Sequence, residues 1–202
     1  MQTSDSRFIR RCPRFAKLQK IAAQANKRFR DTLSGFDLIG LNVGDGPPES
    51  VGGYWCSPIN SKCFADTGGE GVHFSFMCEE EDLDFDNLPV IVTIPAALGA
   101  SFVVGENLYE FLCLGCHRGF FALEQLGHQL EKTLRVYATP TWKAKEDKDW
   151  WVGFGTNETQ CAVLKFLRGQ MGLKQWPRLR TRFRKLQQEF APRIRLREEA
   201  TW

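Results

Sequence analysis

The chain has 202 residues, of which 43% are hydrophobic and 25% charged, a balance typical of a soluble globular protein and not of a disordered, collagen-like or coiled-coil chain. No apolar run is long enough to span a membrane and we find no secretory signal, so we expect a cytoplasmic location. The net charge of +3 is unevenly spread: residues 1–36 carry +7, residues 37–173 carry −10 and residues 174–202 carry +6.

The first predicted element is a basic amphipathic helix within residues 1–36. Pro13 suits a first helical position, apolar residues recur at spacings of three and four from Phe15 to Leu33, and Gly35 is a suitable stop. Lysines and arginines occupy the opposite face. We therefore expect this helix to bury its apolar stripe and turn its charges outward.

Residues 37–135 are predicted to form an α+β core. Short runs of strand character, separated by turns, cover residues 36–43, 53–56, 62–65, 72–78, 88–94 and 102–104. An acidic loop spans residues 79–86. Because no segment of helical length separates these runs, antiparallel pairing is the economical arrangement.

Helical patterns follow the strands. Asn107 with Glu110 resembles a capping box, and helices are predicted over 107–114, 120–134, 157–171 and 177–190. Residues 136–202, an irregular aromatic segment followed by basic helices, are assigned to the same domain as the core. The predicted fold class is α+β: a twisted antiparallel sheet with an N-terminal helix and several C-terminal helices packed around it. In the last helix an apolar stripe predicts docking on this body; it comprises Leu179, Phe183, Leu186 and Phe190.

Cysteines provide two candidate sites. Cys113, Cys116 and His117 match the C-x-x-C-H pattern of covalent haem attachment, but they lie in an apolar run that predicts buried thiols. A zinc ion could be bound by Cys113 and Cys116 together with Cys56 and Cys63. The six residues between Cys56 and Cys63, however, do not suit a zinc knuckle. We expect neither metal nor cofactor.

Two acidic patterns and the three histidines each allow a functional and an ordinary structural interpretation. Asp66-Thr67-Gly68 is the tripeptide of aspartic proteases, but it is also ordinary turn chemistry before a strand. Alternating aspartates at 82, 84 and 86 resemble the start of a calcium loop that lacks its glycine and its final glutamate. None of the three histidines stands beside a nucleophile in a known motif, and a triad formed in space is left open.

Three segments together carry a resemblance to a known family. Residues 64–76 (FADTGGEGVHFSF), 89–95 (PVIVTIP) and 104–112 (VGENLYEFL) resemble the SUKH superfamily, over about residues 60–126. The family's early helix and Asn-Gly turn have no counterpart here. The resemblance implies an α+β domain with a twisted antiparallel sheet and a non-enzymatic role in binding a protein, which in bacterial relatives is typically a toxin. It transfers no catalytic residue.

Three functional hypotheses follow. The first is a protein-binding module of immunity type that neutralises a toxin and binds a basic partner through the acidic loop, at Glu79, Glu80, Glu81, Asp82, Asp84 and Asp86. The second is a nucleic-acid-associated protein that uses the last helix, at Arg178, Arg180, Arg182, Arg184 and Lys185. The third is an aspartic-type hydrolase with Asp66 as its acid.

Overall fold

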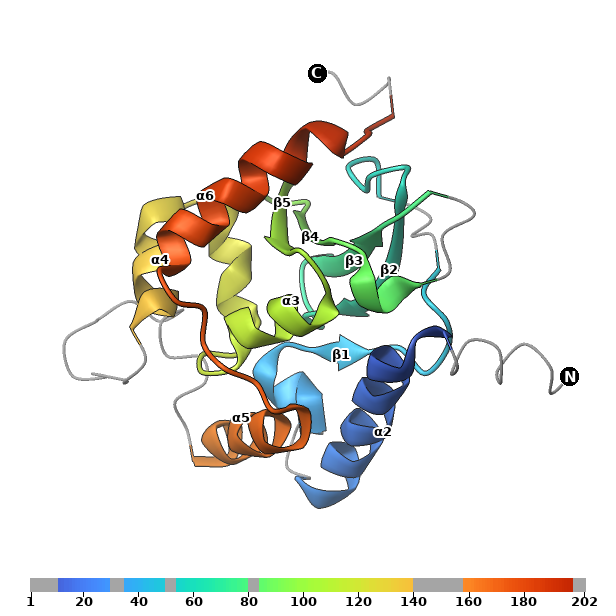
Figure 1. Ribbon diagram of the computed structural model, residues 1–202, viewed down its shortest axis with the longest axis vertical. Helices are drawn as coiled ribbons and strands as arrows, with labels where there is room; N and C mark the ends of the chain where they lie inside the picture. Colours follow the sequence, from blue (N-terminus) through green and yellow to red (C-terminus); the bar gives the residue numbers. More distant parts are fainter. Residues whose placement is uncertain (1–10, 30–34, 50–53, 80–83, 140–157, 198–202) are drawn as a thin grey trace, which may run out of the picture.

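A five-stranded antiparallel sheet forms the centre of the computed structural model, which describes residues 11–29, 35–49, 54–79, 84–139 and 158–197 (Figure 1). Its strands follow one another in chain order: β1 (Asn42–Val43), β2 (Ser61–Asp66), β3 (His73–Met77), β4 (Val90–Ile94) and β5 (Ala100–Gly105). The antiparallel α+β prediction is confirmed.

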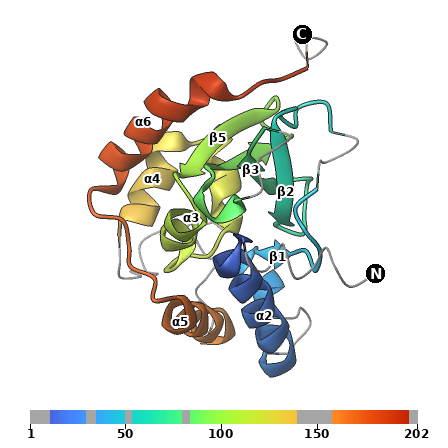
Figure 2. The ribbon, with the colours of Figure 1, turned by 45° about the vertical axis from the view of Figure 1, so that its right-hand side comes forward.

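In the described part of the chain, five α-helices pack around the sheet or against one another: α2 (Pro13–Arg28), α3 (Leu108–Gly115), α4 (Leu130–Ala138), α5 (Glu158–Met171) and α6 (Leu179–Phe190). Helix α6 packs on β5 and on α4, whereas α2 packs on α5 (Figures 1 and 2). The cap predicted for α3 is present, because the Asn107 side chain accepts a hydrogen bond from the Glu110 backbone N–H at 2.9 Å.

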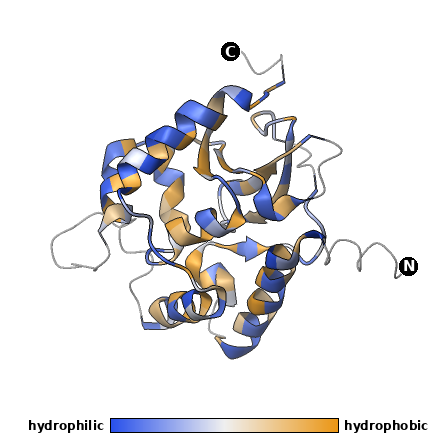
Figure 3. Cartoon of the chain, in the orientation of Figure 1, coloured by the Kyte–Doolittle hydropathy of each residue, from blue (hydrophilic) through white to orange (hydrophobic). Residues whose placement is uncertain are grey.

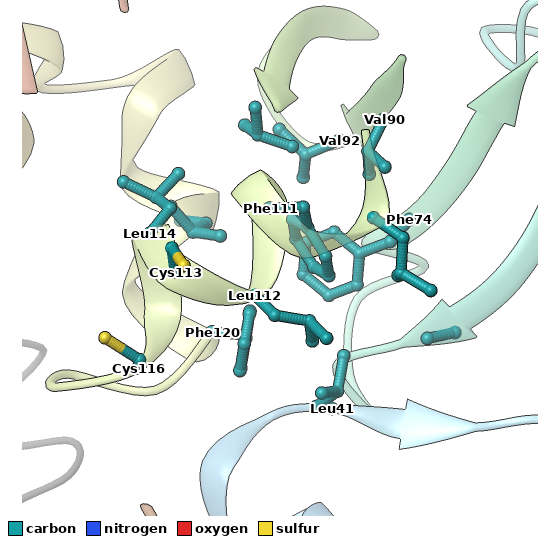
Figure 4. Close-up of a cluster of buried hydrophobic side chains, with 14 of the residues drawn as sticks. Leu41, Phe74, Val90, Val92, Phe111, Leu112, Cys113, Leu114, Cys116 and Phe120 are labelled. Carbon is teal, nitrogen blue, oxygen red and sulfur yellow. The ribbon is translucent and has the colours of Figure 1, made fainter. Parts of the chain in front are cut away.

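One face of the sheet carries the aromatic core. Phe64 and Phe76 stack at 4.3 Å between ring centroids, and Phe111 of α3 packs against Phe74 and Phe120 at 5.0 Å each (Figure 4). The same buried cluster holds Cys113 and Cys116, so the predicted burial of both thiols is confirmed. Burial raises the pKa of the Cys116 thiol to about 12, which keeps it protonated and unreactive at neutral pH.

The opposite face of the sheet carries a row of polar residues beside the buried Ile91 and Val103. His73 of β3 lies opposite Thr93 of β4, which in turn lies opposite Ser101 of β5, and cross-strand partners share a face. The Thr93 and Ser101 hydroxyls are 3.2 Å apart. Residues 54–60, called loop 54–60 below, contact this face through Ser57. Loop 54–60 therefore covers part of this polar row.

The apolar stripes of both basic helices dock on the body, as predicted. On α6 the buried residues are the four that the sequence singles out, and Figure 3 shows hydrophilic residues along much of α2 and α6. Gln187 adds a polar attachment: its side-chain amide donates to the Val103 carbonyl at 2.7 Å and accepts from the Val103 N–H at 3.0 Å. This amide pairs with the edge of β5 as a neighbouring strand would.

Four predicted elements differ in part from the structure. Residues 35–39 form a 3-10 helix instead of a strand, because Gly35 and Gly40 both take positive φ and turn the chain at its ends. The described part of 53–56 is a turn. The helix predicted over 120–134 is divided into a 3-10 helix, Phe121–Gly127, and α4. Helix α2 ends at Arg28, since Phe29 packs on Phe166 of α5.

The N-terminus of α2 is capped by a distant residue. Its local N-cap, Cys12, makes no side-chain cap, and its first turn contains no acid. Instead, the buried Asp86 carboxylate accepts hydrogen bonds from the Arg14 and Phe15 backbone N–H groups, at 2.7 and 2.8 Å. A carboxylate at this end is also favoured by the helix dipole. The placement of Asp86 in an exposed partner-binding loop is therefore corrected.

Removal of this cap gives the first testable prediction. We expect Asp86→Ala to lower the free energy of unfolding by about 2 kcal/mol, because two buried N–H groups lose their acceptor. Urea denaturation followed by circular dichroism measures the change. The control is Asp84→Ala, an exposed aspartate two residues earlier, which should cost under about 0.5 kcal/mol. Equal costs for the two variants would contradict the assignment.

Candidate functional site

The candidate site lies where β2 ends and β3 begins. A hollow of about 380 Å³ opens there; its lining includes Tyr54, Asp66, Glu70 and His73, and it is called the Tyr54 hollow below. A second hollow of about 370 Å³ lies on the β1 side of β2. Asp66 and Cys63 line both. Burial raises the pKa of the Cys63 thiol to about 11, so this sulfur is protonated and a poor nucleophile at neutral pH.

A serine–histidine pair joins loop 54–60 to the sheet. The Ser57 Oγ lies 3.1 Å from His73 Nε2, and His73 Nδ1 lies 2.7 Å from the Gly71 carbonyl oxygen. Because a carbonyl only accepts, Nδ1 carries the proton and Nε2 accepts from the serine hydroxyl. Burial lowers the pKa of His73, which favours this neutral form.

The pair has the hydrogen bond of a nucleophile and its base, but the serine is enclosed. Ser57 is 6% exposed and does not line the Tyr54 hollow. The Tyr54 ring stacks on His73 at 5.6 Å between centroids. A substrate in the hollow would therefore meet the tyrosine and the histidine before the serine hydroxyl. The geometry suits a clamp that fixes loop 54–60 better than an acyl-transfer site.

Asp66 occupies a turn at the end of β2. Its Oδ1 accepts from the Gly68 backbone N–H at 2.7 Å and from the Asn42 side-chain amide at 3.3 Å. The first bond is the local side-chain-to-backbone bond expected of Asp before Thr-Gly-Gly. The hydrolase hypothesis for Asp66 stays a prediction, and the carboxylate has a structural task in this turn.

Loop 54–60 also presents an apolar surface. Six large apolar side chains are exposed in the described part of the chain, and five of them lie on this loop or on two segments that it contacts. The five are called the apolar rim: Tyr54, Trp55, Ile59, Leu98 and Leu196. An apolar grouping of this kind on a protein surface marks an interaction site.

Two sets of contacts attach loop 54–60 to the segments that carry Leu98 and Leu196. A Cβ placed on Gly99 would lie 2.8 Å from the Trp55 ring, so this ring sits directly on the backbone beside Leu98. On the other side the Ile59 backbone N–H donates to the Arg195 carbonyl at 2.8 Å. Asn60 strengthens that contact, since its side chain bonds the Arg193 carbonyl and the Arg195 N–H.

Leu98 is held in an unfavourable conformation. It has φ +53° and is followed by Gly99 at φ +72°, and the Ala100 N–H closes the turn on the Ala97 carbonyl at 3.1 Å. Two consecutive positive φ values are the pattern of a type I′ turn, in which Asn-Gly is preferred. The leucine is nevertheless 93% exposed. Its side chain therefore gains little from contacts within the fold, although the turn would suit another residue better.

The acidic loop is not one continuous free surface. The Glu79 carboxylate pairs with Arg195 of the C-terminal segment at 2.5 Å, and Asp84 accepts from the Asn87 side chain at 2.8 Å. Asp86 caps α2, as described above. Glu80, Glu81 and Asp82 lie outside the described residues. Two of the six proposed partner-binding carboxylates are therefore engaged with distant parts of the chain.

The basic residues of α6 are also partly engaged. Arg182 binds Glu110 of α3 through two bonds of 2.5 and 2.9 Å and also pairs with Glu106. Arg184 pairs with Glu131 of α4 at 2.9 Å. Arg178, Arg180 and Lys185 are partly or fully exposed. Arg182 is therefore not a free surface charge, since it attaches α6 to α3.

Metal-binding hypotheses receive no support from side-chain placement. Within the described ranges, no three His, Cys, Asp or Glu side chains gather as a metal site would require. His117, the last residue of the C-x-x-C-H pattern, instead accepts a 2.6 Å hydrogen bond from Arg168 of α5.

Comparisons with protein-family models, with curated proteins and with solved structures find no match to this chain. Among the described helices, none combines the length and the apolar character needed to cross a membrane.

Sequence reasoning missed the Ser57–His73 pair and the apolar rim. The pair joins residues sixteen positions apart across an irregular loop, and no spacing rule covers it. One signal was available for the rim: Leu98-Gly99 stands at a turn position where Asn-Gly would be usual.

Proposed function

We propose that this chain is a non-enzymatic protein-binding module of immunity type, which captures a protein partner through the apolar rim. The observation that carries the proposal is the exposed, conformationally strained Leu98 beside the half-exposed Trp55. Tryptophan and tyrosine dominate the binding energy of protein interfaces, and a strained apolar residue at a turn tip adds nothing to a free monomer. The α+β architecture is consistent with the resemblance to the SUKH superfamily.

Replacement of Leu98 separates stability from binding. We expect Leu98→Asn to raise the free energy of unfolding by about 1 kcal/mol, because Asn-Gly suits the turn. We expect the same variant to lose about 10-fold or more of its affinity for the partner, since an interface anchor is removed. Urea denaturation gives the first quantity, and quantitative mass spectrometry of proteins co-purified from the native cells gives the second.

A matched control is Leu130→Asn, which changes an exposed leucine at the start of α4, outside the apolar rim. A protein retained by the wild type and by Leu130→Asn but lost from Leu98→Asn supports the proposal. Equal recovery from both variants would move the interface away from the rim. Recovery of nucleic acid, with steep salt dependence that disappears when Arg178, Arg180 and Lys185 are replaced, would favour the nucleic-acid alternative.

A further inference from the structure

The Tyr54 hollow combines an aromatic wall with negative charge. The Tyr54 ring, stacked on His73, forms one side, and the Asp66 and Glu70 side chains line the same space. A Cβ placed on Gly71 would lie 2.6 Å from the Tyr54 ring, so the ring rests on the turn that carries Glu70. Aromatic face and carboxylates are thus held within one small cavity next to the apolar rim.

The carboxylates that line this hollow can accept further hydrogen bonds. In the described chain, the hydrogen bonds of Asp66 go to its Oδ1, and Glu70 makes no ion pair or side-chain hydrogen bond. Among the described residues that line the cavity there is no Lys or Arg. A third carboxylate, Glu124, lies near Glu70. The pKa of Glu124 is raised by burial and also by the negative charge of Glu70. His73 is held neutral by burial and does not oppose a cation.

We propose that the Tyr54 hollow receives an arginine side chain of the partner protein, a specification that rests on the proposed binding function. The guanidinium is planar, so it can stack on the tyrosine ring while it donates hydrogen bonds to Asp66 and Glu70. The residues that flank this arginine in the partner protein would then cover Trp55 and Leu98. The hollow would select a positively charged side chain, and the apolar rim would contribute the apolar surface that is buried on binding.

The test uses the intact chain and a defined probe, N-acetyl-arginine N-methylamide, with the neutral N-acetyl-citrulline N-methylamide as its isosteric comparison. Two-dimensional ¹⁵N NMR titration at low salt should show saturable shifts of the Gly68, Gly69 and Gly71 amides with arginine in the millimolar range, and none with citrulline. Glu70→Gln should weaken the arginine response about threefold. Asp66→Asn is the second variant, and Glu158→Gln on α5 is the matched control.

The outcomes distinguish this proposal from the one on which it rests. Equal shifts with arginine and citrulline, or an arginine response unchanged in both carboxylate variants, would overturn the arginine site. If the arginine site fails while Leu98→Asn still loses the partner, binding through the apolar rim stands without it. If arginine binds as described and Leu98→Asn retains the partner, the hollow stands and the rim does not.

Discussion

Phe111→Ala is expected to lower the free energy of unfolding by about 3–5 kcal/mol, the largest effect of any single substitution considered for this chain. Phe111 is fully buried and its ring packs on three others, from β2, β3 and the segment after α3: Phe64, Phe74 and Phe120. Truncation removes apolar contact and leaves a cavity, because the neighbouring rings belong to separate elements that cannot all move inward.

The size of that effect is measured by urea denaturation, with Phe102→Ala as the matched control. Phe102 is half-buried and packs on Phe183 of α6 at 6.2 Å between ring centroids, so its loss should cost about half as much or less. A cost below about 1.5 kcal/mol for Phe111→Ala would mean that the aromatic cluster is not the centre of the core.

Acid is expected to destabilise the protein as the pH falls below about 6.5. Burial lowers the pKa of His73, and burial together with the Arg168 and Arg118 charges lowers the pKa of His117. Below the unfolded value of 6.5, the unfolded chain therefore binds protons that the folded chain does not, and stability falls as pH falls. The fall in stability ends once the pH is below the pKa values of the two histidines in the folded protein. Its slope is at most about 1.4 kcal/mol per pH unit for each histidine.

Chemical denaturation at pH 7.5, 6.5, 5.5 and 5.0 measures this dependence. His73→Gln should reduce the slope, because the titrating group is gone, although its stability at pH 7.5 should also fall with the loss of the Ser57 bond. A stability that is flat from pH 7.5 to 5.0 would show that neither His73 nor His117 is held neutral by the fold.

Local pattern accounts for much of the fold. Alternation in residues 72–78 and the apolar run 88–94 predict β3 and β4, and the spacing of four apolar residues predicts the buried face of α6. These elements follow from sequence because period and turn chemistry act within a few residues. The C-x-x-C-H cysteines were likewise predicted as buried from their apolar neighbours alone. The strand predicted over 36–43 was wrong for its first half, because two glycines with positive φ turn the chain there, and correct for its end, where β1 forms.

Only the tertiary structure decided which polar groups meet. Asp86 lies 71 and 72 residues from the amides that it caps, and Gln187 lies 84 residues from the strand edge that it pairs with. The Ser57–His73 pair and the apolar rim depend in the same way on where loop 54–60 crosses the sheet. A sequence pattern reports how a residue suits its own element, whereas a hydrogen bond or an exposed patch depends on the neighbours that folding brings to it. Of the candidate site, the sequence therefore indicated Asp66, but neither the residues of loop 54–60 nor their assembly with the sheet.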